Sequence, residues 1–257
     1  MIETLLDEFK VPALARSYNV LHDIHDLRRI ISFVYDWCEL EKLSKPNLHD
    51  LVNKILIKKY KGETTLKAKL VEQFVNQKVT AAFEIRVNKS RADFLTINGH
   101  SKSFEIKSEL DNLYRLRKQV SDYEKVFDYN FIVIDEKHYA KAISIIPARY
   151  GVIVLRGTKL TQDRKGALNN RHDVKRQISL FTKQEFKQSF KIDGITEDEV
   201  IINFSDQEIN TIFKEMLKKR YAKRWSFLVS NASHINAIDY QFFFSHNVDP
   251  RLIYGHY

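Results

Sequence analysis

Two carboxylates and a lysine in the middle of the sequence have the types and spacing needed to act on a phosphodiester. Asp93 is followed, after eleven intervening residues, by Glu105-Ile106-Lys107. On a strand, alternation turns Glu105 and Lys107 to one face and Ile106 to the other. Because Mg²⁺ prefers oxygen ligands, we expect Asp93, Glu105 and the Ile106 carbonyl to hold Mg²⁺ or Mn²⁺. Lys107 would then position an attacking water and stabilise the developing charge.

A bare Glu-x-Lys strand is more often a solvated surface pair, and the turn between the two strands decides between these interpretations. Asn98-Gly99 lies at the centre of this hairpin. A two-residue loop would pair Asp93 with Phe104 and turn Glu105 to the opposite face. A three-residue loop that includes His100, or a bulge with the glycine in the left-handed conformation, brings both acids to one face. We therefore predict an odd-numbered loop or a bulge.

Hydrophobic periodicity predicts the elements that must hold these residues in place. Residues 61–158 show a helical pattern, three short β-type patterns, a second helical pattern and two apolar strands. This order is typical of an α/β fold with helices packed on a mixed sheet. Residues 1–60 and the basic segment 159–257 are mainly helical in pattern, and the three regions are expected to pack as one unit. The predicted core elements are a helix over 64–76, strands over 82–87, 91–97 and 101–107, a helix over 113–127, and strands over 131–134 and 152–155.

The composition favours a polyanionic partner and excludes several kinds of chemistry. Lysine and arginine number 42 against 33 aspartate and glutamate, which gives a formal net charge of +9. The single cysteine, Cys38, excludes an intrachain disulfide, a cysteine-rich zinc site and a four-thiolate iron–sulfur cluster. No apolar run approaches the roughly 20 residues of a membrane span, and the acidic N-terminus is unlike a secretion signal. We therefore expect a cytoplasmic protein with no membrane partner.

Basic residues cluster where the backbone of a nucleic acid could bind. Arg115 and Arg117 belong to the predicted helix 113–127, so their charge would lie beside the proposed metal site. A second basic group near the C-terminus includes aromatic residues that could stack on unpaired bases. Each group alone also fits an ordinary solvated surface. The residues expected to contact nucleic acid are Arg115, Arg117, Lys118, Lys218, Arg220, Arg224 and Trp225.

Together these motifs resemble a known nuclease superfamily. Asp93 and Glu105-Ile106-Lys107, in a helix–strand–strand–strand–helix–strand order, resemble the PD-(D/E)XK, or restriction-endonuclease-like, superfamily. Ala92 stands where the superfamily name has proline, a small departure because that proline is often absent. Gln119-Val120-Ser121-Asp122-Tyr123 resembles the Q-x-x-x-Y motif of the RecB-like branch. A bacterial and phage subgroup known by a locus-tag name is similar over the runs Glu84–Asp93, Phe104–Ser108, Val126–Asp128, Asp239–Phe243 and Asp249–Tyr254.

The resemblance implies an αβββαβ restriction-endonuclease-like core and assigns roles within it. Asp93 and Glu105 would bind the metal, and Lys107 would be the catalytic lysine. Glu63 resembles the first-helix acid that completes the metal shell. An acid at the start of a helix is also favoured by the helix dipole, so that interpretation stays open.

Three more residues gain a role from the resemblance, each with an alternative. Glu84 resembles a first-strand acid, and a surface ion pair with a nearby arginine also explains it. Gln119 and Tyr123, one helical turn apart, would face the active site or the nucleic acid. Tyr123 also continues an apolar stripe, which fits a core position with its hydroxyl at the edge.

These expectations combine into a metal-dependent nuclease that hydrolyses DNA, with RNA left open. Two alternatives remain: a non-catalytic nucleic-acid-binding or interaction module with the same fold, and a nuclease subunit that needs a partner protein. A homodimer is also left open. Defence against foreign DNA such as phage, mobile-element maintenance and repair are all compatible with such an activity.

Overall fold

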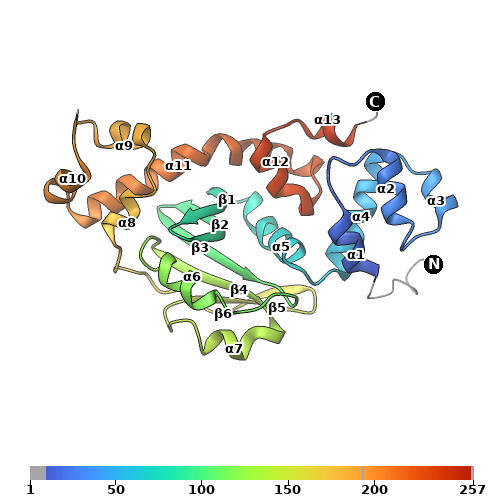
Figure 1. Cartoon of the computed structure of the whole chain (residues 1–257), viewed down its shortest axis with the longest axis horizontal. Helices are drawn as coiled ribbons and strands as arrows, with labels where there is room; N and C mark the ends of the chain where they lie inside the picture. Colours follow the sequence, from blue (N-terminus) through green and yellow to red (C-terminus); the bar gives the residue numbers. More distant parts are fainter. Residues whose placement is uncertain (1–9, 193, 256–257) are drawn as a thin grey trace. The chain divides into compact units, whose positions relative to one another are not determined.

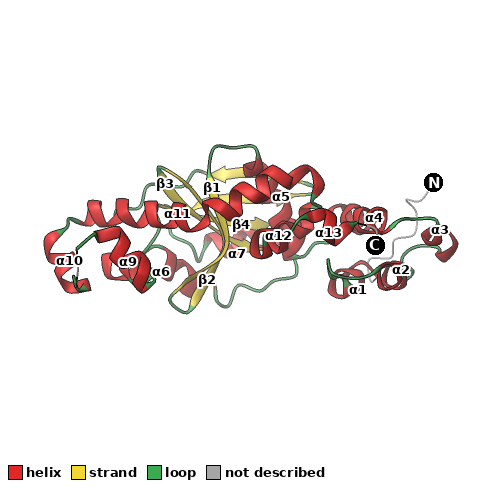
Figure 2. Ribbon diagram, turned by 90° about the horizontal axis from the view of Figure 1, so that it is seen from above, coloured by secondary structure: helices red, strands yellow, loops and turns green. Residues whose placement is uncertain are grey.

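The computed structural model describes residues 10–192 and 194–255 (Figure 1). The chain forms two compact units. Of the described residues, the helical unit comprises 10–76 and 227–255, and the sheet unit comprises 77–192 and 194–226. Strands are confined to the sheet unit in the part of the chain that is described (Figure 2).

These units differ from the predicted regions 1–60, 61–158 and 159–257. The helix before the sheet, α5 (Glu63–Val75), groups with the N-terminal helices and not with the strands that follow it. Residues 227–255 group with the same helices. Long-range packing therefore sets the boundaries, and no glycine- or proline-rich segment marks them.

The sheet unit contains the predicted mixed sheet, so the predicted α/β fold is confirmed. Six strands lie side by side in chain order. The first two pairings are antiparallel, the next two are parallel and the last is antiparallel. The strands are β1 (Thr80–Val87), β2 (Ser90–Asn98), β3 (His100–Lys107), β4 (Tyr129–Asp135), β5 (Gly151–Arg156) and β6 (Lys159–Arg164).

The sequence did not predict β6, because a helical pattern was expected after residue 159. Arg156 pairs with Lys159 across a two-residue turn that begins at Gly157, whose φ is 59°. Such a turn favours a tight hairpin, and glycine supplies the positive φ that it needs. The strand is mostly exposed and charged at the edge of the sheet, so it lacks the apolar alternation that marks a buried strand.

The two faces of the sheet are covered by different helices. On one face, Ile132 and Ile134 of β4 pack with Leu116 and Val120 of α6 (Leu116–Tyr123), and α7 (Tyr139–Ile143) joins the same cluster. The opposite face carries phenylalanine side chains, and Phe94 there contacts Trp225 of α11 (Asp206–Asn231) with ring centroids 6.0 Å apart. The sheet unit is completed by α8 (Val174–Ile178), α9 (Lys183–Phe190) and α10 (Glu197–Asn203), with the 3₁₀ turn η1 (Glu136–His138).

The helical unit has a separate apolar core and a buried polar link. Tyr18 and Tyr254 both donate hydrogen bonds to Asp239 Oδ2, at 3.0 and 2.6 Å. The Tyr18 hydroxyl also lies 2.8 Å from His49 Nδ1. These hydrogen bonds therefore connect the C-terminal runs Asp239–Phe243 and Asp249–Tyr254 to Tyr18 and, through it, to His49 of α4. The elements are α1 (Lys10–Ser17), α2 (Ile24–Ile31), α3 (Trp37–Glu41), α4 (Lys45–Lys59), α5, η2 (Ala232–His234), η3 (Ala237–Asp239), α12 (Tyr240–His246) and α13 (Pro250–Tyr254).

Among the residues described, no helix combines the length and apolar character needed to cross a membrane.

Candidate active site

A one-residue turn brings the two central acids to the same face of the sheet. Asn98 pairs with His100, so Gly99 alone connects β2 to β3, and its φ of 69° is in the left-handed region. Phe94 pairs with Phe104, and one further step of this register places Asp93 opposite Glu105. The predicted odd-numbered turn is therefore confirmed.

Asp93 is fixed at the point where the pairing of β2 with β3 ends. Its Oδ2 accepts a hydrogen bond from the backbone N–H of Ile106 at 2.6 Å. The Ile106 side chain is 1% exposed, and its place on β3 puts it on the opposite face from Glu105. The role predicted for the Ile106 carbonyl stays a prediction.

Glu105 lies between a lysine and a tyrosine, and both are buried with it. Lys107 Nζ lies 2.5 Å from Glu105 Oε1, and the Tyr123 hydroxyl donates to Glu105 Oε2 at 2.8 Å. Glu105 pairs with Ile132 of the parallel strand β4, so this group faces α6 and α7. Tyr123 is 1% exposed, which matches the core alternative, while its hydroxyl contacts the predicted metal ligand.

The surroundings keep both partners of Glu105 protonated. Burial lowers the pKa of Lys107, but the carboxylates of Glu105, Asp93 and Asp111 outweigh it, and the pKa lies above its ordinary value. Burial, followed by the negative charge of Glu105, raises the pKa of Tyr123. At neutral pH the site therefore contains a lysine ammonium and a tyrosine hydroxyl, and both donate hydrogen bonds to Glu105.

Glu84 supplies a further carboxylate from β1. Its neighbours on β1 pair with Phe94 and Ala92, so Glu84 lies opposite Asp93, and the two side chains have carboxylate oxygens within 4.8 Å of each other. Glu84 has a φ of 59°, rare for a residue other than glycine and a feature that clusters at functional sites. Its Oε2 also lies 2.5 Å from Arg91 Nε, so the alternative ion pair is present as well.

Glu63 lies in the helical unit, where it is the first residue of α5. Its Oε1 lies 2.8 Å from Lys67 Nζ one turn later, and Lys67 also donates to Gln241 at 3.0 Å. These contacts fit the helix-start alternative. A role for Glu63 in a metal shell stays a prediction.

Gln119 lies one turn before Tyr123 on α6. Its Oε1 is buried and has no hydrogen-bond partner among the described residues. Buried amide oxygens are normally satisfied, so this one needs a partner such as water, substrate or metal. An amide oxygen without a partner is the kind of ligand that a hard divalent cation accepts.

Of the predicted nucleic-acid contacts, most are exposed. Arg115 and Arg117 are exposed at the start of α6. Lys118 is exposed and pairs with Asp122 at 2.6 Å. On α11, Lys218 and Arg224 are exposed. All five have access to solvent and to a polyanion.

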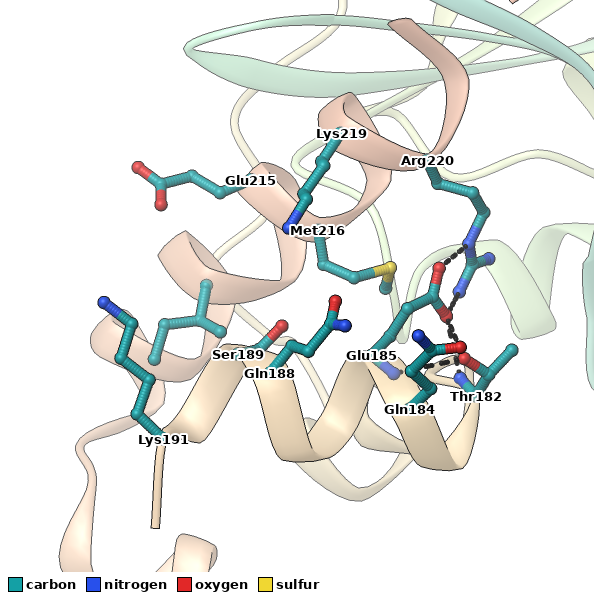
Figure 3. Close-up of a pocket in the computed structure, with 11 residues that line it drawn as sticks. Thr182, Gln184, Glu185, Gln188, Ser189, Lys191, Glu215, Met216, Lys219 and Arg220 are labelled. Atoms are coloured by element: carbon teal, nitrogen blue, oxygen red, sulfur yellow. Dashed lines mark hydrogen bonds and ion pairs between the residues drawn. The ribbon is translucent and has the colours of Figure 1, made fainter. Parts of the chain in front are cut away.

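Two of the predicted nucleic-acid contacts are wrong. Trp225 is 3% exposed and packs on Phe94, so it has no free ring face for a base. Arg220 donates through two nitrogens to Glu185, at 2.7 and 2.6 Å, and also to the Leu180 carbonyl (Figure 3). The pair lies in a cavity of about 530 Å³ between α9 and α11. Arg220 therefore joins two helices and is not available for phosphate.

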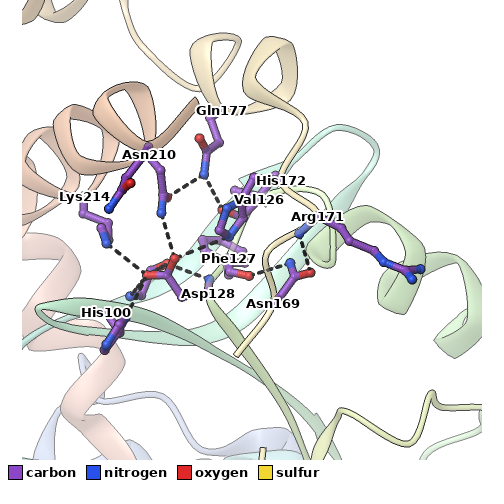
Figure 4. A network of polar contacts seen from close by, with 12 residues as sticks. His100, Val126, Phe127, Asp128, Asn169, Arg171, His172, Gln177, Asn210 and Lys214 are labelled. Carbon is purple, nitrogen blue, oxygen red and sulfur yellow. Dashed lines mark hydrogen bonds and ion pairs between the residues drawn. The ribbon is translucent and has the colours of Figure 1, made fainter. Parts of the chain in front are cut away.

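The sequence did not predict a buried network of hydrogen bonds and ion pairs around Asp128. Asp128 is 2% exposed and accepts hydrogen bonds from Ser101 N–H and from Asn210, at 2.8 and 2.9 Å (Figure 4). Lys214 and His172 each lie 3.4 Å from it. Burial raises the pKa of Asp128, but these bonds and charges outweigh burial and hold it below its ordinary value. The only sequence signal was its place in the Val126–Asp128 motif. The network attaches α11 to the sheet.

Comparison with known proteins identifies a family. Residues 57–242, well over half of the chain, match the family described as "Bacteriophage P4 protein cII". The chain belongs to this family. One similar solved structure is "SPO1766 protein of unknown function from Silicibacter pomeroyi", at 16% identity over 51% of this chain and 93% of that chain, with a TM-score of 0.35. No curated protein matches.

Proposed function

We propose that this protein is a metal-dependent nuclease that hydrolyses DNA phosphodiester bonds. The observation that carries the proposal is the convergence of Asp93, Glu105 and Lys107 on one face of β2 and β3. A two-residue turn would have separated the acids, and the one-residue turn at Gly99 keeps them together. Arg115 and Arg117 are exposed at the start of α6, the helix that supplies Tyr123, and they suit a phosphate backbone.

The metal would be Mg²⁺ or Mn²⁺, held by Asp93, Glu105 and Glu84, and the Gln119 amide oxygen, which has no hydrogen-bond partner among the described residues, would be a further oxygen donor. When bound, such an ion polarises a phosphate oxygen and lowers the pKa of a coordinated water. It is a hard cation suited to this set of oxygen donors.

The protein's own groups have separate tasks in this proposal. Lys107 is charged, so it cannot accept a proton from water and acts by orienting the water and stabilising negative charge on phosphate. Tyr123 holds one oxygen of Glu105 and so fixes the direction of the carboxylate. The N–H of Ile106 does the same for Asp93.

The test compares cleavage of plasmid, linear and single-stranded DNA with Mg²⁺, with Mn²⁺ and with chelator. Asp93→Asn and Lys107→Ala should each lose at least about 100-fold in rate, the scale of removing one charge-stabilising group. Lys102→Ala is the matched control, because Lys102 is on the same strand but the opposite face, and it should cut like wild type. Equal cutting by all the proteins would indicate a contaminating nuclease.

One observation favours a second candidate, a non-catalytic DNA-binding module. Glu105 and Lys107 are 1% and 8% exposed and satisfy each other, as a purely structural buried pair would. In that case DNA would bind without being cut, and Lys107→Ala would lower stability while leaving DNA affinity unchanged.

A further inference from the structure

The segment that joins β3 to α6 displays an exposed aromatic ring. Tyr114 is 87% exposed, and Leu110 on the same segment is 58% exposed. The segment begins directly after Lys107 and ends at the helix that carries Gln119 and Tyr123. It therefore connects the two elements that build the candidate active site.

This segment is held in a defined conformation. The backbone N–H and the hydroxyl of Ser108 both donate to Asp111 Oδ2, at 2.8 and 2.6 Å, and the Asp111 N–H donates to the Ser108 carbonyl at 3.1 Å. Leu113 is 5% exposed and packs in the cluster under α6. Tyr114 follows this anchor directly, so its ring is displayed from a fixed point.

One lysine lies over the exposed ring, and further basic residues lie on or contact the same part of the chain. Lys141 Nζ lies 5.9 Å from the centroid of the Tyr114 ring. Lys137 Nζ donates to the carbonyl of Glu109 on the same segment at 3.4 Å. Arg115 and Arg117 are exposed immediately after Tyr114. An aromatic face among cations is the arrangement that binds unpaired bases by stacking and their phosphates by charge.

The same segment adjoins the candidate active site. Ser108, which is hydrogen-bonded to Asp111, directly follows Lys107 in the chain. A strand whose base stacks on Tyr114 would thus have its neighbouring phosphates close to the end of β3 that carries Lys107. A base inside an intact duplex is already stacked on both sides and offers no free face.

We propose that Tyr114 is a stacking platform for an unpaired base, and that the substrate is single-stranded DNA. This inference rests on the proposed nuclease function for its link to cleavage, but its binding component can be tested alone. The other occupant that an exposed aromatic residue could have is a partner protein, for which base stacking plays no part.

The experiment measures binding of a fluorescein-labelled oligothymidine and of a blunt hairpin duplex in the Lys107→Ala background with Mg²⁺. Tyr114→Ala should weaken binding of the single strand by about 5- to 150-fold, the range for loss of one stacked base, and leave duplex binding unchanged. Tyr114→Phe keeps the ring and should bind like the parent. Phe33→Ala, which truncates a 55% exposed ring in the helical unit, should also bind like the parent.

Three results would overturn the inference: unchanged single-strand binding by Tyr114→Ala, an equal loss on duplex, or no binding of either oligonucleotide by the parent. A failure of the nuclease proposal looks different. In that case the wild-type protein, with Lys107 present, would bind the single strand through Tyr114 and would not cut it with Mg²⁺ or Mn²⁺.

Discussion

Replacing Asp239 by asparagine should make the stability of the protein respond differently to pH. Asp239 is 5% exposed in the helical unit. Burial raises the pKa of its carboxyl group from 3.8 to about 6, against the opposing effect of the hydrogen bonds from Tyr254 and Tyr18. The ionised carboxylate is therefore a cost that the folded state bears near neutral pH.

The size of this cost follows from the shift in pKa. Each pKa unit corresponds to about 1.4 kcal/mol, so a shift of about two units gives roughly 3 kcal/mol. Between about pH 4 and pH 6 the folded state holds more protons on Asp239 than the unfolded chain does. The stabilising contribution is complete below the unfolded pKa and is lost as pH rises through the folded pKa.

The assay is urea unfolding of wild type and Asp239→Asn from about pH 4 to pH 7. Asparagine keeps a carbonyl acceptor for both tyrosines but does not titrate, so the variant should gain roughly 3 kcal/mol relative to wild type over this range. Burial lowers the pKa of His49 to about 3, so His49 makes the free energy of unfolding rise with pH, opposite to the effect of Asp239. Both proteins contain His49, so the difference between their free energies of unfolding removes its contribution. A difference that stays constant with pH would refute the argument.

Three further predictions concern the sheet unit. Tyr123→Phe keeps the buried ring but removes the donor to Glu105, so initial cleavage rates should fall by at least about tenfold while far-UV circular dichroism stays unchanged. Gly99→Ala meets open space but keeps a strained positive φ, so denaturant unfolding should show a loss of about 1 kcal/mol. Arg220→Ala breaks the two-bond pair with Glu185 and should lower the melting temperature, with DNA affinity unchanged in a filter-binding assay.

Local patterns predicted the elements that build the candidate site. Alternation gave β2 and β3 to within a residue or two, and the requirement that Asp93 and Glu105 share a face gave the odd-numbered turn. The left-handed backbone of Glu84 could not be predicted in this way. Nothing in the residue type favours a positive φ within a strand, so the surrounding fold must impose it.

Long-range packing accounts for what the sequence did not reveal. Trp225 was predicted to contact nucleic acid because its sequence neighbours are basic. It lies, however, at the four-residue spacing of the buried residues Ile209, Phe213 and Leu217 along α11. Its ring covers the phenylalanine face of the sheet, and that face cannot be seen from one helix alone. The structural role of Asp128 likewise depends on its contacts with Asn210 and Lys214, which lie more than eighty residues later in the chain.

The charges around Lys107 explain how the candidate site can be both well folded and ready for a cation. Lys107 lies among the carboxylates of Glu105, Asp93 and Asp111, and Glu84 adds a fourth that pairs with Arg91. Carboxylate oxygens gathered in a partly buried place are the ligands that a hard divalent ion prefers. Lys107 pairs with Glu105 in the structure, and under the proposed function its ammonium would stabilise negative charge on the phosphate.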